Sequence, residues 1–175
     1  AMGWGCINVI AVVIAEKVLG GGAAEYGLIL TSVGFGALGG ALLSGGIGQR
    51  ISLNRLFPIG FTVMGVAVAC LAGSRALLMA SASYFFIGTG RIALEVAATT
   101  TYQRAVPDNL RGRIFALRHM VTHVAILLAN QLAGFFTDAA AVTPILISSA
   151  TILLAFVPLS YLLLARSQRA KDGGC

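Results

Sequence analysis

A pair of charged residues lies inside one of the long apolar stretches of this sequence. Arg91 and Glu95 are four residues apart, so a helix places both on one face, which Tyr102 shares. Arg91 comes thirteen residues before Arg104, which is about 20 Å along a helix axis and close to the middle of a membrane. A charge at that depth costs about 2.5 to 3.5 kcal/mol on insertion scales, so these two residues are candidates for binding a ligand or carrying a proton. The alternative is that the two charges only neutralise one another.

A second polar face lies in the stretch from about 112 to 137. His123 and Asn130 come four and eleven residues after His119, so the three residues share one side of a helix. Histidine titrates near neutral pH, so this face could relay protons or line a polar cavity, and the histidines could equally be hydrogen-bonded structural groups. A metal site is not expected, because the glutamate of an HExxH motif is absent and the stretch contains no acidic residue.

The stretches of sequence that must position these residues have the composition of membrane-spanning helices. Of the 175 residues, 58% are hydrophobic and only 10% are charged, and the mean hydropathy is +0.91. A membrane span needs about 20 mostly apolar residues, and stretches of that length recur along the chain. We expect an all-α polytopic membrane protein with six transmembrane helices in one bundle, followed by a polar tail at 166–175. The expected spans are 1–18, 26–48, 56–74, 76–103, 112–137 and 142–165.

Basic residues recur once per two spans, on one side of the expected membrane. Arg50 and Arg55 follow the second span, Arg104, Arg111 and Arg113 follow the fourth, and three more follow the sixth. By the positive-inside rule these connections and both termini are cytoplasmic, and we expect a multi-pass protein of the cell membrane. Topology therefore accounts for the net charge of +6. Nucleic acid is not expected as a partner, because no basic face with interleaved aromatic residues is formed.

The stretch from Val33 to Gly48 contains seven glycines in sixteen residues. In water each mid-helix glycine costs about 1 kcal/mol relative to alanine, whereas in lipid the need to pair backbone polar groups enforces a helix. Gly36, Gly40, Ser44 and Gly48 recur every four residues and form a ridge against which another helix can pack closely. The ridge is interpreted either as ordinary tight packing or as a contact that rearranges when helices rock.

Two connections resemble those of a known superfamily. GGIGQRISLNR, residues 45–55, resembles the signature between the second and third helices of each half of major facilitator superfamily transporters. Gly45 and Arg50 match its opening glycine and first basic position, and Gln49 stands where the family has an acid. YQRAVPDNLRGRIFAL, residues 102–117, resembles the junction of helices ten and eleven in drug and siderophore exporters of that superfamily, the group that includes the enterobactin exporter. The resemblance implies that the six spans correspond to helices seven to twelve of a twelve-helix fold, and that the first of the six lacks its beginning.

The resemblance also implies an activity. Such transporters rock two six-helix halves about a central site, so we expect proton-coupled efflux of a small amphipathic molecule by a C-terminal half. The expected partners are that substrate, H+, the lipid bilayer and an N-terminal six-helix half or partner chain, with no cofactor and no metal. Candidate residues for the central cavity and proton coupling are Arg91, Glu95, Tyr102, His119, His123 and Asn130. Candidates for a cytoplasmic gate are Gln49, Arg50, Arg55, Arg111 and Arg113.

Two other classes of function were weighed. A six-helix module that does not transport, either a truncated product or a half-transporter that needs a partner chain, is the alternative hypothesis. An intramembrane serine protease is disfavoured, because Ser44 lacks a Gly-x-Ser-x-Gly frame and both histidines lie on another span. Cys6 and Cys70 fall in expected spans and Cys175 in the tail, so no disulfide is expected.

Overall fold

The computed structural model describes residues 2–18, 20–47, 53–74, 76–135, 146–147, 149–155 and 157–158. Five α-helices and one π-helical turn account for most of them. The elements are α1 (Met2–Val13), η1 (Ile14–Val18), α2 (Ala23–Ile47), α3 (Leu53–Ala72), α4 (Leu77–Ala105) and α5 (Asp108–Phe135). The described residues between 146 and 158 are helical as well.

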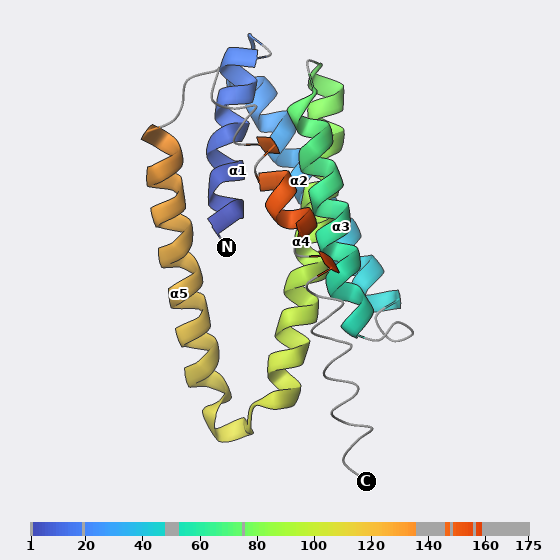
Figure 1. The fold of residues 1–175 in the computed structure, drawn as a ribbon, viewed down its shortest axis with the longest axis vertical. Coiled ribbons are helices and arrows are strands. Elements are labelled where there is room, and N and C mark those ends of the chain that lie inside the picture. The colour runs from blue at the N-terminus through green and yellow to red at the C-terminus, as the bar shows by residue number, and fades with distance from the viewer. Residues whose placement is uncertain are drawn as a thin grey trace.

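Helix α4 is the centre of the arrangement (Figure 1). It has extensive contacts with α2 and with α3, whereas α1 packs mainly against α5. The turn at Val106 and Pro107 joins α4 to α5, and the two helices diverge from that turn along their length. Helix α4 ends at Ala105, two residues before Pro107, which lacks the N–H group that a continued helix needs.

Three helices of the described chain are long and apolar enough to cross a membrane. They cover Ala23–Gly46, Leu77–Ala105 and Asp108–Leu132, and Leu56–Ala72 is a shorter apolar helix. The α-helical part of the expected first span, α1, has 12 residues and continues into the five residues of η1. Most of the expected sixth span lies outside the described residues. The chain is therefore a helical membrane protein.

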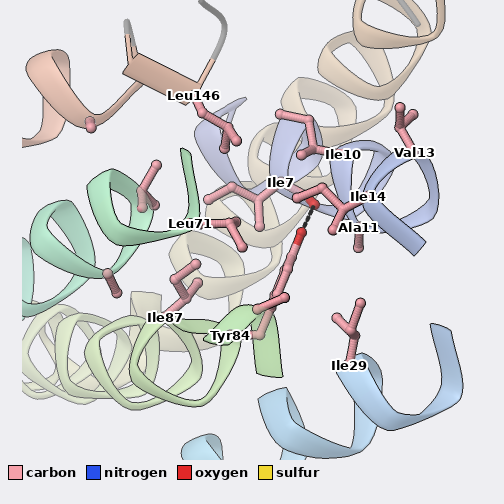
Figure 2. Packing of buried hydrophobic residues seen from close by; sticks show 14 of the residues in the cluster. Ile7, Ile10, Ala11, Val13, Ile14, Ile29, Leu71, Tyr84, Ile87 and Leu146 are labelled. Atoms are coloured by element: carbon pink, nitrogen blue, oxygen red, sulfur yellow. Dashed lines mark hydrogen bonds between the residues drawn. The ribbon is translucent and has the colours of Figure 1, made fainter. Parts of the chain in front are cut away.

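The main core lies where α1, α3 and α4 meet (Figure 2). Tyr84 of α4 is 1% exposed, and its hydroxyl donates a hydrogen bond of 3.1 Å to the carbonyl oxygen of Ile7 on α1. A buried phenol needs such a partner, because an unpaired hydroxyl in an apolar interior costs free energy. Leu71 of α3 and Ile87 of α4 belong to the same apolar cluster. Tyr84 thus fixes α1 against α4 and belongs to the core.

Many apolar side chains of α2 and α5 are exposed. Of the α5 span only 6% is buried inside the described chain, compared with 39% of the α4 span. Large exposed side chains on these helices include Leu38 and Leu42 of α2 and Met120 and Leu127 of α5. Open apolar area of this kind suits contact with lipid or with further helices.

Candidate functional site

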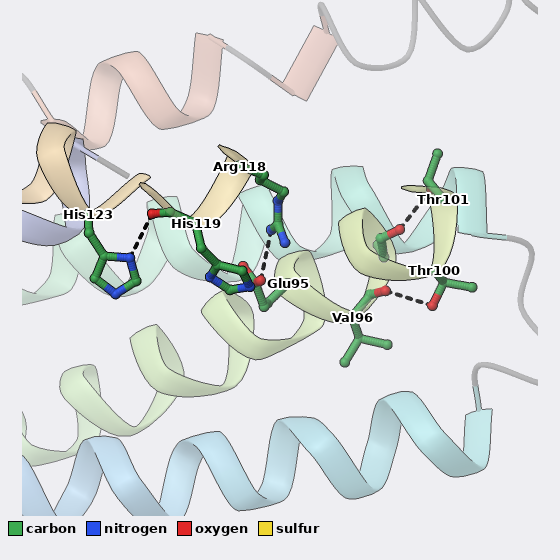
Figure 3. A network of polar contacts seen from close by, with 8 residues as sticks. Glu95, Val96, Thr100, Thr101, Arg118, His119 and His123 are labelled. Carbon is green, nitrogen blue, oxygen red and sulfur yellow. Dashed lines mark hydrogen bonds and ion pairs between the residues drawn. The ribbon is translucent and has the colours of Figure 1, made fainter. Parts of the chain in front are cut away.

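An ion pair joins the two diverging helices α4 and α5 (Figure 3). A guanidinium nitrogen of Arg118, Nη2, lies 2.7 Å from Glu95 Oε1, and the two side chains are 18% and 47% exposed. Glu95 lies within the candidate span of α4 and Arg118 within that of α5. The charge at Glu95 is therefore balanced from a different helix, by a residue that the sequence-based site prediction did not include.

Arg118 makes a second contact with α4. Its guanidinium carbon lies 5.4 Å from the centre of the Tyr102 ring, within the range of a cation–π interaction. Tyr102 also meets Phe115 of α5 edge to face, with ring centres 6.4 Å apart. The other terminal nitrogen of Arg118, Nη1, is buried and has no hydrogen-bond partner among the described residues.

Arg91 lies one helical turn before Glu95 on α4, as the spacing predicts. It is partly buried and takes part in at least one interaction. The ion pair found for Glu95 in the described part of the chain is the one to Arg118. Pairing across helices couples the positions of α4 and α5, which a pair within one helix could not do.

The two histidines lie on an exposed side of α5. His123 Nδ1 is 2.8 Å from the carbonyl oxygen of His119, and the two rings lie 6.1 Å apart. Asn130, two to three turns further along the helix, is partly buried, and its Oδ1 atom has no partner among the described residues. No group of three or more potential metal ligands occurs in the described ranges.

Arg111 ties together the turn between α4 and α5. Its Nη2 atom donates a 2.8 Å hydrogen bond to the carbonyl oxygen of Gln103, in the last turn of α4. The same atom lies 2.7 Å from Asp108 Oδ1, at the start of α5. Carbonyls at a helix C-terminus have no partner inside the helix, so Arg111 satisfies one of them while it pairs with an acid at the next N-terminus.

The other predicted gate residues differ in what can be said of them. Arg113 is exposed on the first turns of α5. Arg55 lies in the first turn of α3. Gln49 and Arg50 lie outside the described residues, as does Gly48 of the glycine ridge.

The glycine ridge of α2 packs directly against the backbone of α4. A Cβ atom on Gly36 would fall on the carbonyl oxygen of Phe85, and one on Gly40 would come within 2.6 Å of the carbonyl oxygen of Thr89. Thr89 Oγ1 also donates a 3.0 Å hydrogen bond to the carbonyl oxygen of Gly36. Ser44 is buried further along the same side. By contrast, a Cβ atom on Gly34 would meet nothing within 4 Å.

The geometry is that of a helical membrane protein with charged residues between its spans, as in proteins that move polar solutes. The model of one family of the major facilitator superfamily, described as transmembrane secretion effector, matches residues 2–173. The chain belongs to this family. Neither the curated proteins nor the solved structures contain a significant match to this chain. Membership points to a transporter rather than an enzyme.

Proposed function

We propose that this chain is the C-terminal six-helix half of a secondary transporter of the exporter group. The transporter would expel a small amphipathic molecule by alternating access, in exchange for protons. Family membership supports transport, and three long apolar helices support a place in the bilayer. In this proposal both termini are cytoplasmic, the protein lies in the cell membrane, and an N-terminal half or partner chain supplies the opposite wall of the cavity.

The ion pair between Glu95 and Arg118 carries the proposal. It joins two helices that diverge from one turn, and each partner lies within a candidate span. A proton on Glu95 would remove its charge and leave Arg118 free to bind an electron-rich group of the substrate through its donor arms. Loss of the pair would also remove a restraint between α4 and α5. Protonation and substrate binding would thereby act on the same contact.

The other candidates take places around this contact in the proposal. Tyr102 would hold the guanidinium group in place through its ring. Arg91, Asn130, His119 and His123 would add polar wall to the central cavity. The cytoplasmic gate would comprise Gln49, Arg50, Arg55, Arg111 and Arg113, with Arg111 acting through the α4–α5 turn that it ties.

The test is efflux from cells that express the uninterrupted reading frame containing this chain. A panel of fluorescent amphipathic dyes serves as substrate, with and without a proton gradient. Glu95→Gln should abolish the part of efflux that depends on the gradient, because the amide cannot carry the proton. Glu25→Gln is the matched control, because Glu25 is an acid in the first turn of α2, outside the α4–α5 contact. Unchanged gradient dependence in Glu95→Gln would remove Glu95 from the mechanism.

A second candidate is a six-helix module that assembles with a partner and does not itself transport. The openness of α5, whose span is 6% buried, favours it. If no second six-span segment lies upstream in the reading frame and no dye is expelled, this candidate replaces the first. Chemical crosslinking in membranes would then identify the homodimer or the separate partner chain.

A further inference from the structure

Two hollows follow one another along the side of α4 that faces between α2 and α3. The larger has a volume of about 500 Å³ and is lined by α3 and α4 only, and the smaller, of about 190 Å³, is lined by α2, α3 and α4. Val63 of α3 lines both, so the two hollows are neighbours. We call the two hollows together the outer groove.

The outer groove lies on the opposite side of α4 from the candidate site. Met79, Phe86 and Ala93 are seven residues apart and form one stripe along the groove. Glu95 comes nine residues after Phe86, which is half a turn away around the helix. From Met79 to Ala93 the groove follows fourteen residues of a candidate span, or about 20 Å, which exceeds the roughly 15 Å hydrocarbon depth of one membrane leaflet.

The lining of the larger hollow is almost entirely apolar, and the thiol of Cys70 is its one polar group without a hydrogen bond among the described residues. It contains no charged residue, and its two hydroxyl groups are used within their own helices. Thr62 Oγ1 donates to the carbonyl oxygen of Pro58 at 2.8 Å, and Ser83 Oγ donates to that of Met79 at 2.9 Å. A lining without charges, whose hydroxyl groups already donate hydrogen bonds to the backbone, complements a hydrocarbon chain. It would leave the polar groups of an amphipathic solute unpaired.

The described part of the C-terminal segment packs elsewhere on α3. Leu154 lies against Gly65, because a Cβ atom on Gly65 would come within 2.9 Å of the Leu154 side chain. Gly65 is two residues after Val63 and is therefore almost on the opposite side of α3. The lining side chains Val66, Met79 and Phe86 stay 50%, 46% and 52% exposed. The groove is thus open to the surroundings of a membrane-embedded helix pair.

We propose that the outer groove binds the acyl chain of a membrane lipid. The lipid is a ligand of this half of the protein, seated between α3 and α4 on the side away from the Glu95–Arg118 pair. Its chain fills the space that the two helices leave between Val63 and Phe86, and it supplies the contacts that an empty apolar hollow lacks. This inference requires the membrane location and is independent of substrate and proton coupling.

The first experiment places a fluorescent reporter in the groove. In a Trp4→Phe background, Phe86→Trp puts a tryptophan in the lining, and Leu38→Trp puts one on the open face of α2 as a control. Both proteins are reconstituted in phosphatidylcholine vesicles that contain a small fraction of lipid with brominated acyl chains. The brominated fraction is then raised in steps. We expect quenching of the Phe86→Trp reporter to rise in proportion to that fraction, because one bound chain contacts it, and quenching of the Leu38→Trp control to rise more steeply, because several lipids surround it.

The second experiment blocks the groove. Ala82→Leu adds bulk at an exposed lining position, and Ala41→Leu makes the same change at an exposed position of α2 outside the lining. Native mass spectrometry of the purified protein in detergent should show one retained lipid with the parent chain and with Ala41→Leu. Retention should be lost with Ala82→Leu.

Three results would overturn the proposal. An equally steep rise in quenching of the two reporters would mean ordinary solvation by lipid. A reporter that brominated lipid does not quench would mean that another helix covers the groove. Equal lipid retention by the two leucine variants would place the lipid elsewhere. None of these results bears on the Glu95 efflux test, so the two proposals can fail separately.

Discussion

Helix α4 meets α2 and α5 through two different kinds of contact. Against α2 the backbones touch, because Gly36 and Gly40 leave no side chain between them and the carbonyl groups of α4. Against α5 the contact runs through long polar side chains, the pair of Glu95 and Arg118 with the Tyr102 ring beside it. A backbone contact cannot lengthen without opening a void, whereas an ion pair is released when one charge is neutralised. We therefore expect α2 and α4 to move as one body and α5 to shift relative to them.

The backbone contact should be the more sensitive of the two to substitution. Gly36→Leu would force α2 and α4 apart, because even its Cβ atom has no room beside the carbonyl oxygen of Phe85. Overpacking of this kind costs about 3 kcal/mol, and we expect a large loss of folded protein. The measurement is the yield and thermal unfolding of protein purified in detergent.

Gly34→Leu is the matched control for that change. A Cβ atom at Gly34 meets nothing within 4 Å, so this leucine has open space. Its yield and unfolding temperature should stay close to those of the parent chain. Leucine is the better helix former, so similar losses in both variants would mean that added bulk anywhere on α2 is responsible and that the α2–α4 contact is not.

The ion pair of Glu95 and Arg118 should show itself through coupling. Arg118→Gln leaves Glu95 without its charge partner, and Glu95→Gln leaves Arg118 without its own. Because Glu95 is 47% exposed, we expect each single change to cost about 1 kcal/mol, less than for a fully buried pair. The double variant should cost less than the sum of the two, as measured by thermal unfolding in a double-mutant cycle. Additive effects would contradict the pairing.

Tyr102 offers a smaller test of the same contact. Tyr102→Phe keeps the ring under the Arg118 guanidinium group and should leave stability unchanged. Tyr102→Ala removes the ring and should cost about 0.5 to 1 kcal/mol. Thermal unfolding of the two variants decides between the ring and the hydroxyl as the group that matters. An equal loss in both would assign the effect to the hydroxyl.

Features that depend on residues close in sequence could be predicted before the structure was known. Apolar length predicted the two spans, 26–48 and 76–103, that contain most of α2 and α4. The four-residue spacing placed Arg91 one turn from Glu95 on α4. These properties depend on the length of an apolar stretch and on helical geometry, and both can be read from residues close together in the sequence.

Contacts between distant residues could not be predicted in the same way. A period of four residues picks out Gly36 and Gly40, but it does not say that Phe85 and Thr89 lie against them. The partner of Glu95 is 23 residues away on another helix, and helical spacing carries no information about how two helices are turned toward one another. Arg118 could have been singled out as the one arginine well inside the expected fifth span.

Of the contacts that α4 makes with α2 and α5, the turn between α4 and α5 should be the least sensitive to substitution. Arg111→Ala removes the hydrogen bond to the Gln103 carbonyl and the ion pair with Asp108. Because Asp108 is 89% exposed, the pair is well solvated and its loss should cost only about 0.5 kcal/mol. Arg104→Ala, at an exposed position in the last turn of α4 and outside the proposed gate, is the control that should change thermal unfolding little. If both variants unfold like the parent chain but only Arg111→Ala slows efflux, Arg111 acts by positioning α5 rather than by stabilising it.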